Sequence, residues 1–301
     1  MLTTIPFFIR IKKTLTPVAF LLLLLLLILC LPQCTPNEDP LPAYIKIDST
    51  LFTAEPTQGT AQQKIEAVWL YNNNVLQGVY ELPATIPIIE TGNRNIIIQA
   101  AVANSGRNDW RLIYPFFTAW ENTVSLTPLE TVTLTPNFTY NNFPTYFDFL
   151  GDFELGNDFQ TLNDSVPLLI TENPNEVFEG NRSAKLSLNA QHPQFVIATI
   201  DSYNLPAAGK PVFLELHYRC EAPFQISLIF FQKTGDVDNY PVMFVNDKLT
   251  WNKIYANMGN SVTDVLANGG KKIRIAVKGN LPDRLSTANF YFYNIKLMHQ
   301  K

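Results

Sequence analysis

Charged side chains are scarce in this 301-residue sequence, in which Asp, Glu, Lys and Arg together make up 16%. Acidic residues outnumber basic ones, and the formal net charge is -4 at pH 7. Phosphate binding needs clustered Lys and Arg, and the body of the chain has one dense basic run, at residues 271–274. We therefore expect no nucleic-acid partner.

Cysteine and histidine occur three times each. No histidine has metal-ligand spacing, and the zinc-protease, C-x-x-C, G-x-S-x-G, P-loop and dinucleotide glycine motifs are all missing. These absences argue against a zinc site and a serine hydrolase. Cys220 is the one cysteine of the body, so it cannot form an intramolecular disulfide there. Free cysteine is among the most buried residues, so we expect Cys220 to be buried. His217, three residues away, would point to the opposite face of the strand, which argues against a reactive thiol.

Long stretches with a 3.6-residue hydrophobic period are also missing, so we expect few helices, with one helical turn at 261–267. The 21 prolines and the 12% aromatic residues suit strands joined by turns. Apolar and polar residues alternate over 184–189 and 272–277, as in strands with one buried face. The sequence therefore predicts an all-β fold.

The N-terminal segment, residues 1–33, is the most hydrophobic part of the chain. Three basic residues precede an unbroken apolar run at 18–31, which is the order typical of a secretory signal peptide. The run is shorter than the roughly 20 residues that span a bilayer. An uncleaved N-terminal anchor helix is the alternative. With either, we expect the body of the chain outside the cytoplasm.

Residues 31–34, with the sequence LPQC, resemble a bacterial lipobox. The resemblance implies that Cys34 is lipidated and becomes the new N-terminus, which anchors the protein to a membrane. Gln33 departs from the small residue usual before that cysteine, and Cys30 is a second candidate with a poorer match.

Residues 34–43 then form the lipidated cysteine and a polar, Pro-rich tether. The acidic pair at 38–39 is similar to the surface-export signal of Bacteroidota lipoproteins, although a short acidic linker would have the same sequence. The implied location is the cell envelope, as an outer-membrane lipoprotein that the export signal would place at the surface.

Residues 44–139 contain short strand-like runs separated by turns, a spacing typical of a β-sandwich. Asparagine tolerates positive φ, so the three asparagines at 72–74 predict a tight hairpin. The runs at 68–71 and 77–83 resemble the immunoglobulin-like or carboxypeptidase-regulatory-like modules of bacterial surface proteins. That resemblance implies a scaffold without chemistry. The predicted strands are 44–47, 65–71, 77–80, 86–89, 95–101, 114–120, 123–126 and 130–134.

Residues 140–146 predict a linker, and a second pattern occupies 147–301. Its segments resemble, in their order, the galactose-binding-like jelly roll of many carbohydrate-binding modules; they are 152–154, 177–188, 212–218, 251–255 and 288–297. The implied architecture is an immunoglobulin-like β-sandwich followed by a galactose-binding-like jelly roll.

The jelly-roll resemblance implies a structural calcium ion held by Glu154, Glu179 and Asn294. Calcium binds six to eight oxygen ligands, which suits carboxylates and carbonyls. Asn294 stands where an acidic residue is common, and ordinary solvated side chains are the alternative.

Sugar binding requires exposed aromatic rings that stack on the sugar and polar side chains that form hydrogen bonds with its hydroxyls. The candidates in predicted loops are Arg182, Tyr203, Tyr240, Trp251 and Arg284. Packing in the core is the alternative for each aromatic residue.

These patterns predict a non-enzymatic envelope lipoprotein that binds a glycan or an envelope protein. One alternative is an accessory subunit of an envelope secretion or gliding apparatus. Another is a glycoside hydrolase, which would use paired acids such as Glu154 or Asp236.

Overall fold

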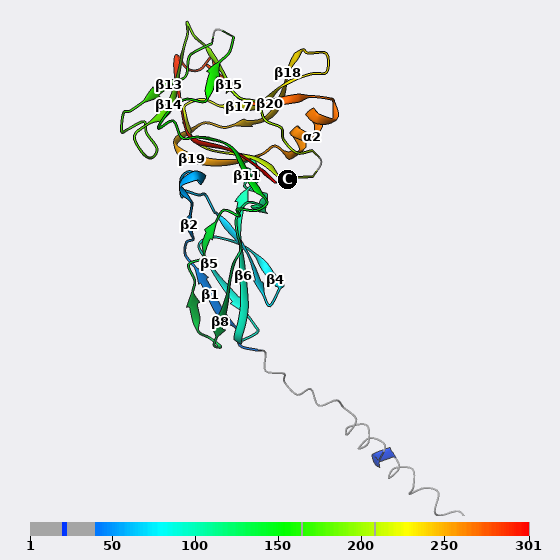
Figure 1. Cartoon of the computed structure of the whole chain (residues 1–301). Coiled ribbons are helices and arrows are strands. Elements are labelled where there is room, and N and C mark those ends of the chain that lie inside the picture. Colours follow the sequence, from blue (N-terminus) through cyan, green and yellow to red (C-terminus); the bar gives the residue numbers. More distant parts are fainter. Residues whose placement is uncertain (1–19, 23–39, 164, 208, 301) are drawn as a thin grey trace, which may run out of the picture. The chain divides into compact units, whose positions relative to one another are not determined.

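The computed structural model describes residues 20–22, 40–163, 165–207 and 209–300. The predicted signal peptide lies outside the described residues except for residues 20–22. Cys34 and the tether up to residue 39 also lie outside them. No helix within the described ranges is long and apolar enough to cross a membrane. Residues from Leu41 onward form one compact unit (Figure 1).

The described part of this unit confirms the all-β prediction. It holds strands, one short α-helix and one 3-10 turn, η1 (Pro56–Gln58). The helix, α2 (Gly259–Ala267), covers the helical turn predicted at 261–267. The strands form two sandwiches, drawn in blue to green and in green to red in Figure 1.

The first sandwich has two main layers around one core. One layer has the strand order β5 (Ala84–Ile88), β1 (Ala43–Ile47), β9 (Thr131–Thr133). The other has the order β4 (Val75–Glu81), β3 (Ala67–Asn72), β6 (Gly92–Ala103), β7 (Arg111–Ile113), and β8 (Trp120–Leu126) also pairs with β6. A parallel pair, β2 (Leu51–Thr53) and β10 (Asn137–Thr139), completes this half. The two layers contribute alternate side chains to a core of isoleucine, valine and aromatic residues.

The predicted Asn hairpin is confirmed between β3 and β4. Asn73 and Asn74 have φ values of 45° and 66°. A two-residue turn of this kind requires positive φ at both positions, which asparagine adopts more readily than most residues. The turn thereby fixes the register of the two strands.

The strand predicted at 114–120 is wrong, because β8 begins only at Trp120. Pro115 has no N–H to donate to a sheet. The buried Tyr114 ring contacts Phe213, and its hydroxyl donates a hydrogen bond to Glu215. The segment therefore connects the first sandwich to the second rather than extending a sheet.

The second sandwich is a two-layer antiparallel jelly roll. Its larger sheet has the order β13 (Leu169–Thr171), β14 (Ser183–Asn189), β21 (Thr287–Gln300), β16 (Val212–Cys220), β19 (Lys248–Asn257), and β11 (Thr145–Gly151) also pairs with β21. Its smaller sheet has the order β12 (Phe159–Thr161), β15 (Gln194–Thr199), β20 (Lys271–Asn280), β17 (Phe224–Phe231), β18 (Val237–Val245). β11 begins inside the segment predicted as a linker, where Tyr140 is buried.

The predicted alternation of strand residues is confirmed in β14. Leu186 and Leu188 point into the core of the second sandwich, while Lys185 and Ser187 point outward. Cys220 also lies in this core as a free thiol, as predicted. Burial raises the pKa of the Cys220 thiol to about 11, so it is protonated and unreactive at neutral pH.

Candidate binding site

The larger sheet of the second sandwich has one face turned away from its own core. On β16, Leu214 and Leu216 point inward, so Glu215 and His217 point to the other face. Part of that face is covered by the first sandwich. Phe213, Tyr255 and Met298 from the second sandwich belong to the core of the first. The two sandwiches therefore share one continuous packed boundary.

A buried charge cluster lies at this boundary and consists of Glu215, Lys253, Lys296, Tyr114 and Tyr140. The two carboxylate oxygens of Glu215 each accept a tyrosine hydrogen bond of 2.8 Å, from Tyr114 and Tyr140. The Lys253 ammonium is 2.7 Å from Glu215 Oε2. Lys296 donates to the Tyr140 hydroxyl at 2.7 Å and lies 3.9 Å from the same carboxylate oxygen.

The charges in this cluster do not cancel when every group is ionised, because one carboxylate faces two ammonium groups. Burial acts to raise the pKa of Glu215, but Lys253 and Lys296 outweigh it and lower the pKa. Burial lowers the pKa of Lys253 and lowers that of Lys296 to about 7. Lys253 is the closer cation to Glu215, at 2.7 Å against 3.9 Å for Lys296.

Gln63 ties the cluster to the segment before β3. Its Oε1 accepts hydrogen bonds from Lys253 at 2.5 Å and Tyr255 at 3.2 Å, and its Nε2 donates to Tyr140 at 3.1 Å. The backbone N–H of Lys64 donates to the Tyr255 hydroxyl at 2.9 Å. These bonds satisfy most polar atoms of the buried charge cluster, whose role is therefore to hold the two sandwiches together.

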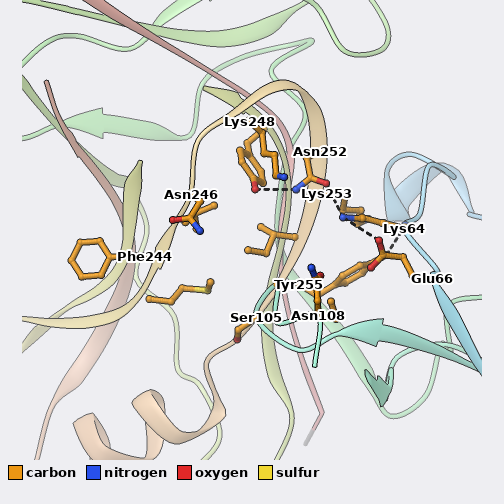
Figure 2. Close-up of a pocket in the computed structure, with 16 residues that line it drawn as sticks. Lys64, Glu66, Ser105, Asn108, Phe244, Asn246, Lys248, Asn252, Lys253 and Tyr255 are labelled. Atoms are coloured by element: carbon orange, nitrogen blue, oxygen red, sulfur yellow. Dashed lines mark hydrogen bonds and ion pairs between the residues drawn. The ribbon is translucent and has the colours of Figure 1, made fainter. Parts of the chain in front are cut away.

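A cavity of about 350 Å³ opens beside the cluster, and we call it the inter-sandwich cleft (Figure 2). Figure 2 shows its polar side chains converging from both sandwiches. The cleft is lined by Lys64, Glu66, Ala103, Ser105, Gly106, Asn108, Tyr218, Met243, Phe244, Val245, Asn246, Lys248, Asn252, Lys253, Ile254 and Tyr255.

The loop after β6 forms one wall of the cleft, and its conformation depends on two residues with positive φ. Ser105 has φ 50° and Gly106 has φ 73°. A Cβ on Gly106 would lie 3.2 Å from Ile254 Cδ1, so glycine permits a close approach to β19. Ser105 N–H donates to the Tyr255 carbonyl at 3.0 Å, and Ser105 Oγ accepts from Asn257 N–H at 3.1 Å.

Fixed hydrogen bonds orient the polar groups on the floor of the cleft. Lys64 Nζ donates to Asn252 Oδ1 at 2.9 Å and lies 3.3 Å from Glu66. Asn252 Nδ2 donates to the Tyr218 hydroxyl at 2.9 Å, and Glu66 also pairs with Arg111 at 3.0 Å. Figure 2 shows the Lys64, Glu66 and Asn252 interactions as dashed lines. The floor is thus pre-organised before any ligand arrives.

The rim of the cleft carries groups without partners. Asn108, Asn246 and Lys248 are exposed, and among the described residues their side chains have no hydrogen-bond or ion-pair partner. Phe244, from β18, is 74% exposed. Amides that can donate and accept, an ammonium group and an open aromatic ring are the groups that recognise a hydroxyl-rich ligand.

None of the five sequence-predicted sugar-binding residues lines this cleft. Arg182 lies in a separate open pocket, where it pairs with Glu172 at 2.9 Å. Trp251 lies on the outward face of β19, with the Arg219 guanidinium 5.6 Å from its ring centroid. Arg284 is 4.0 Å from Asp247.

The two predicted tyrosines are partly buried at other places. Tyr203 packs against the core of the second sandwich, and burial raises its pKa to about 12. Tyr240 packs against the same core and donates a hydrogen bond to Asp264 at 2.7 Å. The structure does not bring the five predicted residues together, and their role in ligand binding stays a prediction.

Two of the residues predicted to hold calcium, Glu154 and Glu179, lie close enough to Tyr293 that, besides burial, their charges raise its pKa. Both oxygens of the Glu154 carboxylate accept hydrogen bonds from the backbone N–H of Asn181 at 3.0 and 3.3 Å. Asn294 is fully buried, and neither of its side-chain polar atoms has a partner in the described chain. Across the described ranges no group of three or more His, Cys, Asp or Glu side chains could hold a metal ion. Calcium at Glu154, Glu179 and Asn294 stays a prediction.

The sequence matches no protein-family model and no curated protein. Solved structures of carbohydrate-binding modules resemble about half of the chain. The C-terminal family 22 module of Clostridium thermocellum Xyn10B covers 50% of this chain and 91% of its own, at 12% identity and a TM-score of 0.37. A family 11 module from Clostridium thermocellum, in complex with a β-1,3-1,4-mixed-linked tetrasaccharide, covers 51% and 94%, at 12% identity and a TM-score of 0.36.

A third similar structure, TmCBM61 in complex with β-1,4-galactotriose, covers 49% of this chain and 93% of its own, at 15% identity and a TM-score of 0.31. At such TM-scores these likenesses do not assign a ligand to this chain. The residues of the inter-sandwich cleft are the basis for the function proposed next.

Proposed function

We propose that this protein is a non-catalytic lipoprotein of the cell envelope and that its inter-sandwich cleft binds a glycan. The observation that carries the proposal is the set of exposed, unpartnered polar groups on the cleft rim, beside the exposed ring of Phe244. A sugar presents hydroxyls at its edges and C–H groups on its faces, and this rim offers partners for both.

The size and lining of the cleft agree with this ligand class. Its volume of about 350 Å³ falls at the lower end of the range of small-ligand sites, roughly 300–1,000 Å³. That volume suits a short stretch of a sugar chain. The lining includes three amide and three ammonium groups beside its apolar side chains, which disfavours a purely apolar ligand.

The cleft lacks the arrangement that glycoside hydrolysis needs. Hydrolysis uses two carboxylates on opposite sides of the scissile bond, roughly 5 to 10 Å apart. Among the described residues that line the cleft, Glu66 is the single carboxylate, and it pairs with Arg111 and Lys64. Glu215 lies in the buried charge cluster with its oxygens already bonded. We therefore favour binding over catalysis.

A glycan array probed with the full-length protein in detergent tests the binding role. Phe244→Ala should reduce the signal, because the variant loses the open stacking surface. Phe143→Ala removes a ring that is 80% exposed and does not line the cleft, so its array signal should match the wild type. An empty array, together with co-purification of outer-membrane proteins, would favour the accessory-subunit alternative.

The proposal includes the location of the protein, which a lipid would anchor to a membrane of the cell envelope. The lipobox resemblance supports a lipid at Cys34. The first sandwich would then be an immunoglobulin-like spacer, and the second a galactose-binding-like module. Fractionation and fatty-acid labelling of cells that express Cys34→Ala test the anchor. The variant should lose both label and membrane attachment, whereas Cys30→Ala should keep them; unchanged labelling of Cys34→Ala would rule out this anchor.

A further inference from the structure

One of the three lysines that line the cleft has no ion-pair partner among the described residues. Lys253 pairs with Glu215 at 2.7 Å, and Lys64 pairs with Glu66 at 3.3 Å. Lys248 is exposed and has no partner among the described residues. The cleft lining holds three lysines and one carboxylate, whereas the whole chain has a formal charge of -4.

The acidic side chain nearest to Lys248 in sequence does not cancel this charge. Asp247 is 4.0 Å from Arg284, and the structure contains no ion pair between Asp247 and Lys248. The Lys248 ammonium is therefore available to a ligand.

Hydrogen-bond donors accompany this ammonium. The Tyr218 oxygen accepts a hydrogen bond from Asn252, and the Ser105 oxygen accepts one from Asn257, so each hydroxyl proton remains free to be donated. The amides of Asn108 and Asn246 add further donors on the rim. A site rich in donors, with its one lining carboxylate already paired, favours a ligand rich in acceptors.

We infer that the inter-sandwich cleft selects an acidic glycan, whose anionic substituent pairs with the Lys248 ammonium. The inference rests on the proposed glycan binding and adds the charge of the ligand. Carboxylate and sulfate groups share the required chemistry, since an ammonium group recognises either as a point charge. The experiment below distinguishes these two sources.

Calorimetric titration of the full-length protein can test this with matched sugars. The probes are oligogalacturonate, alginate oligosaccharides and unsulfated chondroitin oligosaccharides, each compared with its carboxyl-reduced, neutral form. Carboxyl-reduced chondroitin sulfate, which retains only sulfate, forms the second arm. We expect at least one acidic probe to bind about tenfold more tightly than its neutral form, the size of one charge-assisted hydrogen bond.

Lys248→Gln should abolish that tenfold preference while leaving the weaker binding of the neutral form. Lys271→Gln removes an exposed lysine that does not line the cleft, and it should keep the preference. Preference for a carboxylated probe or for the sulfate-only probe identifies the source of the anionic group. Added salt should weaken binding of the acidic probe more than that of the neutral one.

Two other results would overturn the inference. One leaves the proposed glycan binding intact, and the other overturns it as well. If neutral sugars bind as tightly as acidic ones, and Phe244→Ala weakens both equally, the ligand is a neutral glycan and only the charge assignment is wrong. If neither the acidic nor the neutral series binds and the glycan array is also empty, the proposed function is wrong as well.

Discussion

Two lysines of strand β19 lie five residues apart and have opposite surroundings. Lys253 is buried, with its ammonium between Glu215 and Gln63. Lys248 is exposed and has no partner in the described chain. The contrast teaches that residue type does not decide the role: a buried, fully bonded lysine fixes the two sandwiches, and an exposed, unbonded one remains free for recognition.

The largest expected effect is on stability and comes from the buried side of this comparison. Glu215→Gln keeps the shape of the side chain but removes the only carboxylate of the buried charge cluster. It leaves two buried ammonium groups without a counter-charge, so the free energy of unfolding should fall by roughly 3–5 kcal/mol. Urea unfolding followed by tryptophan fluorescence measures the loss.

Glu81→Gln is the matched control for that substitution. Glu81 is 70% exposed and pairs with Arg111 at the surface, at 3.1 Å. Its loss should cost less than about 1 kcal/mol. Equal effects of the two substitutions would contradict the view that the buried charge cluster holds the sandwiches together.

The second effect is a pH dependence that arises from Lys296. Its pKa falls from 10.5 to about 7 in the folded protein. Between these values the unfolded chain binds a proton that the folded protein does not, so the free energy of unfolding should rise as the pH increases from about 7 towards 10.5. Above about pH 10 the trend should reverse, because burial raises the pKa of Tyr114 and Tyr140 well above 10.

Urea unfolding at a series of pH values measures this profile in the wild type and in Lys296→Met. The variant should lose most of the rising limb between pH 7 and 10; a smaller rise from Lys253, whose pKa is also lowered by burial, should remain. Lys271→Met, which changes an exposed lysine, should keep the full rise. An undiminished rising limb in Lys296→Met would show that another group causes the pH dependence.

The third and smaller effect concerns Asn252, on the cleft floor between the buried charge cluster and the exposed rim. Asn252→Ala removes the amide that connects Lys64 with the Tyr218 hydroxyl. The protein should lose about 1 kcal/mol of stability, the usual contribution of a hydrogen bond, while glycan affinity falls about tenfold because the cleft floor is no longer oriented. Calorimetric unfolding and titration measure both; a stability loss without any change in affinity would exclude Asn252 from the binding site.

Local sequence patterns predicted several features of the fold. Asparagine at positions 73 and 74 indicated a turn that needs positive φ, and the usual burial of free cysteine placed Cys220 in a core. These predictions succeeded because the cause lies within a few neighbouring residues.

The same periodicity gave no warning of the buried charge cluster. Glu215 alternates with Leu214 and Leu216, a pattern that normally indicates a solvated face. Only the packing of the first sandwich, through residues such as Tyr114, turns that face inward. The clue in the sequence was indirect, since Lys253 and Lys296 lie far along the chain from Glu215.

The cleft was unpredictable for a similar reason. Its polar residues come from four separate parts of the chain, at 64–66, 105–108, 218 and 246–255. No local motif connects them, so they become a site only when the two sandwiches pack together. The sequence-based candidates were chosen as loop aromatics and arginines, and that criterion overlooks amides and lysines on a rim.

The most direct test of the central claim combines two measurements on one triple variant, Asn108→Ala, Asn246→Ala, Lys248→Ala. These side chains are exposed and unpartnered within the described chain, so the urea-unfolding free energy should stay within about 1 kcal/mol of the wild type. The glycan-array signal of the same preparation should disappear. A folded triple variant that still gives the wild-type array signal would contradict the assignment of the inter-sandwich cleft as the binding site.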